Sequence, residues 1–341
     1  MNVVLCALAL LSGVIGAGFA SGREITRFFA AHGRAAGAAA LCALAVLYAL
    51  FVRLPGQMRR AGVRTLPALC RVRFGTGLGA LCAALFSLLA AVTGGAMLAA
   101  CAELAALTLP LRHAYGIGLF ASLLLAALLA ALGVRGLALP GAALCAALPV
   151  LLLHLLVLPA GEACFLPVMS PDLPVRAVAD GTAYGALNAA MLCGALPLLL
   201  SLDRRDRRRA ALLFTALFGA MLLLGIAVCR RHLQEVWMQP MPFVALCRRL
   251  GFGGYLLCAL TLYAAALSSL CAMLAAIAQP MPRGIGPIVA GAACLLFARV
   301  GFTHLVSGFY PVLGAVCAAL MLLLCLPLGE SPRPPRDGAQ A

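Results

Sequence analysis

The sequence predicts an all-α polytopic membrane protein with ten transmembrane helices in two inverted five-helix repeats. Composition is the first observation: of 341 residues, 65% are hydrophobic and only 10% are charged. The surface of a soluble domain with that balance could not be hydrated. The second observation is the length of the apolar runs, about 20 residues each, which crosses a hydrocarbon core of about 30 Å. These runs do not alternate in the way that strands of a membrane barrel do.

The third observation is an internal similarity between segments that lie half the chain apart. Their offset is 177 residues at one end and 176 at the other, which indicates a duplication. The segments share three anchors: Ala68–Arg71 matches Ala245–Arg248, Phe74-Gly75 matches Phe252-Gly253, and Met97–Ala100 matches Met273–Ala276.

Five spans are expected in each half, and an odd number inverts the second half relative to the first. Residues 1–158 form the first repeat, 159–179 an external loop, 180–328 the second repeat and 329–341 a disordered cytoplasmic tail rich in proline. The expected spans are 3–29 and 180–201, both interrupted, and 36–54, 75–108, 114–132, 137–158, 210–228, 250–278, 285–300 and 305–328.

The charges predict an orientation in the bilayer. The net charge is +15 and all basic residues are arginines, concentrated in the loops 53–73 and 203–209. The positive-inside rule then places both termini in the cytoplasm of a multi-pass protein of the bacterial cytoplasmic membrane. On this topology Arg71 is cytoplasmic and its repeat mate Arg248 is external. The first 20 residues are a retained span, because no arginine precedes Arg23 as a signal peptide requires.

Catalytic and metal-binding patterns are missing from the sequence. The 15 cysteines are scattered through apolar runs without CxxC or Cys-His spacing. No Ser-His-Asp order, HExxH motif or phosphate-binding loop is present. We therefore expect no enzyme, no cofactor, no nucleic-acid partner and no metal other than a coupling sodium ion.

Two interruptions in the spans mark the expected site. Gly13–Gly22 contains four glycines, and a break in lipid is tolerated only where it lines a cavity or ligand site; close helix packing is the alternative. The second break is expected at Tyr184–Asn188 and Gly194–Pro197. The repeat offset carries Gly194 and Pro197 back into the first break, and paired interruptions point to a transport site.

Polar residues near these breaks are the candidate ligands. Ser268 and Ser269 offer two hydroxyls to a cation, although each could instead bond back to its own helix. Thr93 is the repeat mate of Ser269, and Asn188 adds a buried amide. Glu24 could couple transport to protons or bind a cationic group, with a salt bridge to a neighbouring arginine as the alternative. Glu103, near a helix end, is expected to be solvated at the interface.

The opening Gly16–Ile25, with Phe28-Phe29 and Gly33 after it, resembles that of the YkvI-type bacterial membrane proteins. The closing Gly301–Val306 and Tyr310-Pro311 resemble that group's last helix. This chain has Arg23 where the group is expected to carry Gln. The group is similar to the amino acid–polyamine–cation transporters, so the resemblance implies a LeuT-like fold with broken helices 1 and 6.

The resemblance also implies a sodium site and a substrate site. The ion site would use backbone at Ile15 and Gly18 with the hydroxyls of Ser268 and Ser269. The substrate would contact Ala17, Gly18, Ala20, Ser21, Gly22, Thr93, Tyr184 and Asn188.

The expected function is cation-coupled secondary transport of a small solute, such as an amino acid, by alternating access. The coupling ion is sodium or a proton. Two alternatives are a non-transporting sensor or assembly factor that retains a transporter fold, and a drug/metabolite-type exporter. The long third and eighth spans speak against the exporter, and the hydroxyl and amide groups near the breaks speak against the non-transporting protein.

Overall fold

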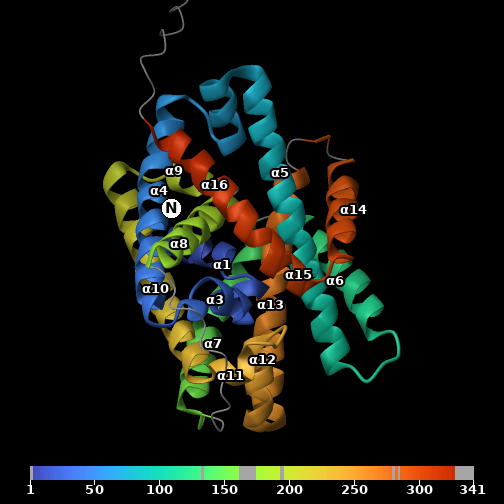
Figure 1. Ribbon diagram of the computed structural model, residues 1–341. Helices are drawn as coiled ribbons and strands as arrows, with labels where there is room; N and C mark the ends of the chain where they lie inside the picture. Colours follow the sequence, from blue (N-terminus) through green and yellow to red (C-terminus); the bar gives the residue numbers. More distant parts are fainter. Residues whose placement is uncertain are drawn as a thin grey trace, which may run out of the picture.

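The computed structural model describes the backbone of residues 3–131, 134–160, 174–192, 196–278, 281–282 and 285–326. Over these residues the chain is helical and contains no strand (Figure 1). Four apolar helices of 10–17 residues accompany five longer segments. The five are long and apolar enough to cross a membrane: Ala30–Arg60, Leu66–Thr108, Arg204–Arg231, Pro242–Ala278 and Phe302–Cys325.

The predicted interruption of the first span is present. Helix α1 (Val3–Val14) ends before Gly16, whose backbone is extended at φ −95° and ψ −176°. A single turn, α2 (Ala17–Ala20), follows, and Gly22 at φ +81° then separates it from α3 (Arg23–Phe28). Only glycine adopts that left-handed conformation without strain, which explains why the chain can turn twice within one span.

The expected sixth span, 180–201, contains most of α8 (Pro174–Met191) and all of α9 (Leu196–Leu200), which includes Pro197. The expectation that Tyr184–Asn188 is unwound is wrong, because these residues lie inside α8. Gly185 is tolerated there since it lets α8 approach α4 closely: a Cβ at Gly185 would lie 2.6 Å from the Ala43 carbonyl oxygen. Gly194, the other expected part of this break, lies outside the described residues.

The remaining predicted spans coincide with helices whose ends differ from the prediction by up to six residues. The chain is also helical before the third span, from Leu66, and it bends sharply at Gly75, where the predicted span begins. The last span contains a π-helical turn, η4 (Leu305–Phe309), between α15 (Phe302–His304) and α16 (Tyr310–Cys325). The other helices are α4 (Ala36–Arg60), α5 (Leu66–Thr108), α6 (Ala114–Ala131), α7 (Val134–Val157), α10 (Arg204–Arg231), α11 (Leu233–Val236), α12 (Pro242–Cys247), α13 (Gly251–Ala278) and α14 (Gly286–Ala298).

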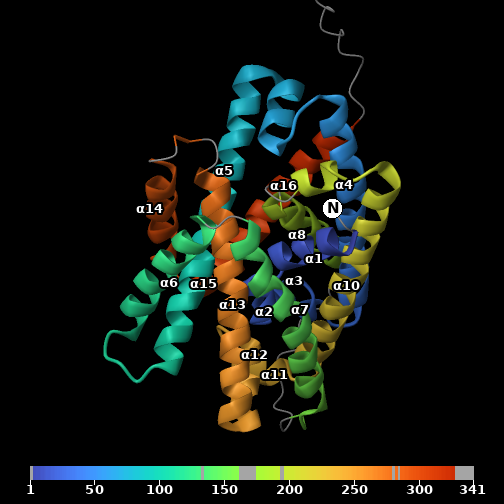
Figure 2. The same cartoon turned by 180° about the vertical axis from the view of Figure 1, so that it is seen from behind.

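Several helix contacts recur when each helix is replaced by its expected counterpart half the chain away. Helix α4 packs on α8 as α10 packs on α1, α8 packs on α16 as α1 packs on α7, and α5 packs on α14 as α13 packs on α6. The long helices α5 and α13 pack on each other. They run in opposite directions, since α5 begins at the top of Figure 1 whereas α12 and the start of α13 lie at the bottom. Figure 2 shows the same arrangement from behind.

The two long helices also begin alike. A short helical stretch precedes Gly75 at φ +77° and ψ −173°, and another precedes Gly251 at φ +77° and ψ −176°. These glycines correspond at an offset of 176 residues. The backbone therefore pairs Gly75 with Gly251, whereas the sequence similarity predicts a pairing with Gly253.

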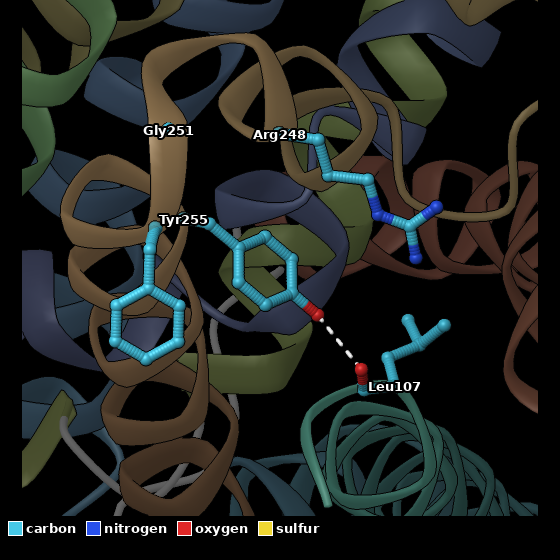
Figure 3. Close-up of a pocket in the computed structure, with 5 residues that line it drawn as sticks. Leu107, Arg248, Gly251 and Tyr255 are labelled. Carbon is cyan, nitrogen blue, oxygen red and sulfur yellow. Dashed lines mark hydrogen bonds between the residues drawn. The ribbon is translucent and has the colours of Figure 1, made fainter. Parts of the chain in front are cut away.

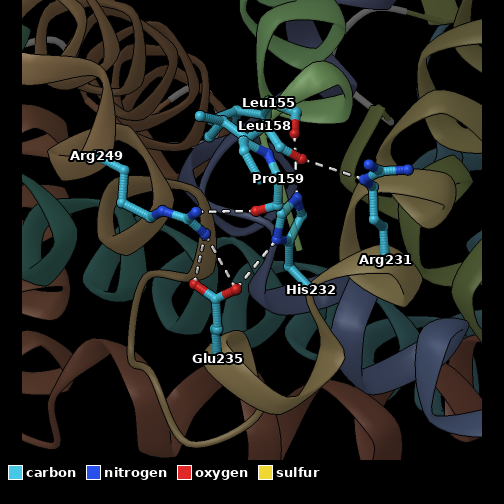
Figure 4. Close-up of polar contacts among 7 residues, drawn as sticks. All are labelled: Leu155, Leu158, Pro159, Arg231, His232, Glu235 and Arg249. Atoms are coloured by element: carbon cyan, nitrogen blue, oxygen red, sulfur yellow. Dashed lines mark hydrogen bonds and ion pairs between the residues drawn. The ribbon is translucent and has the colours of Figure 1, made fainter. Parts of the chain in front are cut away.

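Arginine side chains connect different helices at both ends of the molecule. At the Arg-rich end, where α4 ends and α10 begins, Arg59 donates to the carbonyls of Leu200 and Leu202, and Arg73 to that of Leu326 at 2.9 Å. Figure 4 shows the network at the opposite end. Arg249 lies 3.0 Å from Glu235 and donates to the Pro159 carbonyl at 2.9 Å. The His232 ring lies 3.2 Å from both Glu235 and the Leu155 carbonyl. Arg231 donates to the Leu158 carbonyl at 3.2 Å.

Close packing of α8 on α4 yields a test of the fold. A Cβ at Gly181 would overlap the Ala39 carbonyl, so Gly181→Val must push the helices apart. We expect a loss of about 1–3 kcal/mol of stability and a lower thermal unfolding midpoint of the protein in detergent. Gly116→Val in α6 is the matched control, because nothing lies within 4 Å of the added Cβ. Equal midpoints for the two variants would contradict this packing.

Candidate functional site

The gap between α1 and α2 lies against both long helices. A Cβ at Gly16 would lie 3.1 Å from the Met97 sulfur of α5 and 3.1 Å from the Ser269 hydroxyl of α13. The Ala17 amide donates to the Met97 sulfur at 3.1 Å. The first break therefore contacts both long helices, α5 and α13.

The gap between α2 and α3 is covered by the start of α12. The Phe243 amide donates to the Ser21 carbonyl at 2.8 Å, and the Phe243 ring lies against Gly22. A Cβ at Gly22 would approach that ring to 2.9 Å. Glycine at this position therefore permits both the left-handed backbone and the close contact with the Phe243 ring. The α12 segment thus closes the broken span on the side away from the Arg-rich end.

Glu24 is the buried carboxylate of this region, with an exposed fraction of 5%. Its Oε2 accepts a hydrogen bond from the Tyr184 hydroxyl at 3.0 Å. Its Oε1 lies directly over the Cα of Gly18, where any larger residue would overlap it. The carboxylate thus joins the first broken span to α8, the sixth.

Neighbouring arginines do not neutralise Glu24. The Arg23 guanidinium donates to Ser307 at 3.1 Å and to the carbonyls of Trp237 and Gln239 at 3.3 and 3.1 Å. Arg27 lies 3.8 Å from Asp180. Throughout the described residues, no Arg or His forms an ion pair with Glu24, so a salt bridge within the chain does not account for its burial.

Aromatic rings surround the Glu24–Tyr184 contact. The Tyr184 ring centroid lies 5.1 Å from that of Phe28 and 4.9 Å from that of Phe29. Tyr310 is fully buried and lies within electrostatic reach of Glu24. A carboxylate among apolar rings favours a cationic ligand or a proton, since an isolated buried charge is strongly disfavoured.

Three buried hydroxyls near this region make no hydrogen bond of normal geometry in the described part of the chain, although two of them, on Thr93 and Tyr310, lie close to each other. They belong to Thr93, Ser269 and Tyr310. Thr93 and its repeat mate Ser269 have exposed fractions of 2% and 3%, so equivalent positions of the two long helices carry the same unsatisfied group. A buried hydroxyl without a partner is costly, and such atoms mark sites that a ligand can satisfy.

Other predicted ligands are already engaged within their own segments. Ser268 donates to the Ala265 carbonyl at 3.0 Å and Asn188 to the Tyr184 carbonyl at 2.9 Å, the back-bonding weighed as the alternative for the serines. Ser21 donates to the Gly18 carbonyl at 3.1 Å. Ile15 and Ala20 are buried beside these residues. Of the two serines, Ser269 is therefore the one whose hydroxyl is better placed to bind an ion.

Sequence reasoning missed three residues of the site. Met97 and Phe243 contact the breaks. The sequence marks Met97 only as the start of a repeat anchor, and nothing in the surroundings of Phe243 distinguishes it from other apolar residues. Tyr310 appears in the sequence only as part of the closing motif, without a role. Glu103 is half-buried rather than fully solvated, and its Oε1 accepts from the Phe302 amide at 3.4 Å.

The different engagement of the two serines predicts different effects of removing them. Ser269→Ala is expected to raise the sodium concentration needed for half-maximal binding or transport about tenfold, because it removes an unsatisfied oxygen beside the break. Ser268→Ala, the matched control, removes a hydroxyl already bonded to its own helix and should change it less than about twofold. Sodium titrations of solute binding measure both. A larger effect of Ser268→Ala would reverse the assignment.

No protein-family model matches the chain. No curated protein matches it either.

Proposed function

We propose that the protein is a cation-coupled secondary transporter of a small solute, with a site at the interrupted first span and Glu24 as the coupling carboxylate. The observation that carries the proposal is a buried carboxylate without a basic partner, set beside a helix break and bonded to Tyr184 of another span. Such a group suits a cation-coupled transporter, because it can take up and release a proton or another cation during each cycle.

The recurring helix contacts support a duplicated architecture for this proposal. The pairings α4–α8, α8–α16 and α5–α14 have the counterparts α10–α1, α1–α7 and α13–α6, and the long helices α5 and α13 run antiparallel. Ten spans in two inverted halves would give the two sides of the membrane equivalent access to a central site. The YkvI-type and LeuT-like resemblance is part of this proposal.

The charge of the site favours a cation or a zwitterion over an anion. Glu24 supplies a negative charge, and Thr93, Ser269 and Tyr310 supply hydroxyl oxygens. Hydroxyl and carboxylate oxygens suit both a sodium ion and an ammonium group. We therefore propose an amino acid or a similar solute as substrate, with a proton or a sodium ion as coupling ion.

Transport by purified protein in proteoliposomes tests the proposal. Uptake of labelled amino acids is measured with an inward sodium gradient, with an inward proton gradient at equal sodium, and with neither. Accumulation driven by one gradient alone would support the proposal and identify the ion. Specific binding without uptake under any gradient would favour a non-transporting sensor, and solute efflux driven by an inward proton gradient would favour an exporter.

A further inference from the structure

A hollow lies beside the segment that covers the broken span, at the end of the molecule opposite the Arg-rich one. It has a volume of about 370 Å³ and lies between the end of α5, the start of α6 and the α11–α12 segment. This volume is in the range of small-molecule sites. Its lining combines apolar residues with an acid, a base, a phenol and an amide: Leu107, Met241, Glu103, Arg248, Tyr115 and Gln239.

Arg248 is held at the rim by an aromatic contact. Its guanidinium carbon lies 5.9 Å from the centre of the Tyr255 ring, and the Tyr255 hydroxyl donates to the Leu107 carbonyl at 3.0 Å. Figure 3 shows these three residues around an adjoining hollow of about 300 Å³, which shares Leu107 and Arg248 with the first. No hydrogen bond from Arg248 to another described side chain or carbonyl occupies its donors.

Glu103 lines the same hollow and is held by a different contact. Its Oε1 accepts from the Phe302 amide, which leaves Oε2 without a bond to the described residues. Although both charges line one hollow, Glu103 and Arg248 form no ion pair with each other within the described chain. Opposite charges that share a cavity without pairing present separate contacts to a ligand that carries both signs.

We propose that this hollow is a second binding site, for a zwitterionic α-amino acid with an apolar side chain. Arg248 binds the carboxylate, Glu103 binds the ammonium group, and the side chain contacts Leu107 and Met241. A free anion would meet the Glu103 carboxylate and a simple amine would meet the Arg248 guanidinium, so only a zwitterion satisfies both.

The site adjoins the segment that covers the broken span. Gln239 lines the hollow, and its carbonyl accepts from Arg23 of α3. Phe243, four residues further on, covers Gly22. A solute bound here would lie beside α12, whose Phe243 packs against Gly22 of the broken span. The inference rests on the proposed function only where it assumes that a solute passes from this hollow to the broken span. Binding to the hollow is measured without transport.

The chain carries its own reporter of binding, because Trp237 is its single tryptophan. It precedes Gln239 by two residues, and its carbonyl also bonds to Arg23. Fluorescence of the full-length protein in lipid nanodiscs is titrated with glycine, L-alanine, L-leucine and L-methionine. We expect a saturable change with leucine or methionine. Leucine methyl ester, which lacks the anionic group, and N-acetyl-leucine, which lacks the cationic one, should each bind at least about tenfold more weakly.

Substitutions then assign the change to this hollow. Arg248→Gln and Glu103→Gln should each raise the dissociation constant at least about tenfold. Glutamine at 103 keeps an oxygen for the Phe302 amide, so the fold contact is retained. Arg230→Gln is the matched control, since Arg230 is exposed at the same end but does not line the hollow.

Failure of this inference is distinguishable from failure of the proposed transport. Glu24→Gln should leave the binding fluorescence change intact while it alters transport. No saturable change with any of the four amino acids would overturn the second site. Equal affinity for N-acetyl-leucine and leucine, or unchanged binding in Arg248→Gln, would overturn it as well.

Discussion

Replacing Glu24 with glutamine is expected to abolish gradient-driven accumulation of solute. Glutamine keeps the size of the side chain and can still accept the Tyr184 hydroxyl bond, but it carries no charge and exchanges no proton. A potential of about 100 mV supplies about 2.3 kcal/mol per charge, enough for about 40-fold accumulation. With the variant the internal solute concentration should only equal the external one, which uptake by proteoliposomes measures.

The control for this experiment is another acid without a place in the site. Asp206→Asn changes an exposed carboxylate that pairs with Arg209 at the surface, and it should accumulate solute as the unaltered protein does. Accumulation by Glu24→Gln at the unaltered level would remove Glu24 from the coupling step. Exchange of labelled for unlabelled solute should persist in Glu24→Gln, because exchange needs no net movement of the cation.

Adding one methyl group at Gly18 is expected to have an effect nearly as large. Its Cβ would overlap the Glu24 carboxylate, which must then leave the Tyr184 hydroxyl. We expect Gly18→Ala to lower the rate of coupled transport at least about tenfold, with a loss of about 1–3 kcal/mol of stability from overpacking. Initial rates of uptake and thermal unfolding midpoints provide the two measurements.

Gly56→Ala makes the same chemical change where nothing lies within 4 Å of the new Cβ. Its transport rate should be unchanged, and its helix α4 should be slightly favoured, because alanine is a better helix former than glycine. Normal transport by Gly18→Ala would show that the carboxylate does not need its place over Gly18.

The helices could be predicted because hydrophobic length and glycine placement determine them locally. The double interruption at Gly16 and Gly22 follows from residues that tolerate unusual backbone conformations. The helical course of Tyr184–Asn188 could not be predicted, since it depends on a tertiary contact between Gly185 and α4. The helical stretch before Gly75 was missed for a different reason: Arg71 and Arg73 interrupt its apolar run, so it was assigned to the Arg-rich loop 53–73.

The site could be predicted only in part, because composition does not specify which face of a helix points inward. Ser268 and Ser269 are adjacent, so they project about 100° apart and only one can face the break. The sequence does not distinguish them. Glu24 was recognisable because a charge inside an apolar span is unusual. The proximity of Tyr310 to Glu24 could not be predicted, because the two residues lie near opposite ends of the sequence.

The π-helical turn Leu305–Phe309 sets the phase of everything that follows it. A turn that holds one residue more than an α-helical turn rotates the later side chains by about 100° relative to an uninterrupted helix. Tyr310, the first residue after the turn, is fully buried, whereas Phe309 before it has an exposed fraction of 44%. The number of residues in the π-helical turn therefore determines the direction in which the Tyr310 hydroxyl points. Deleting one of the five residues Leu305–Phe309 would turn that hydroxyl away from the core, although no residue of the site would be substituted.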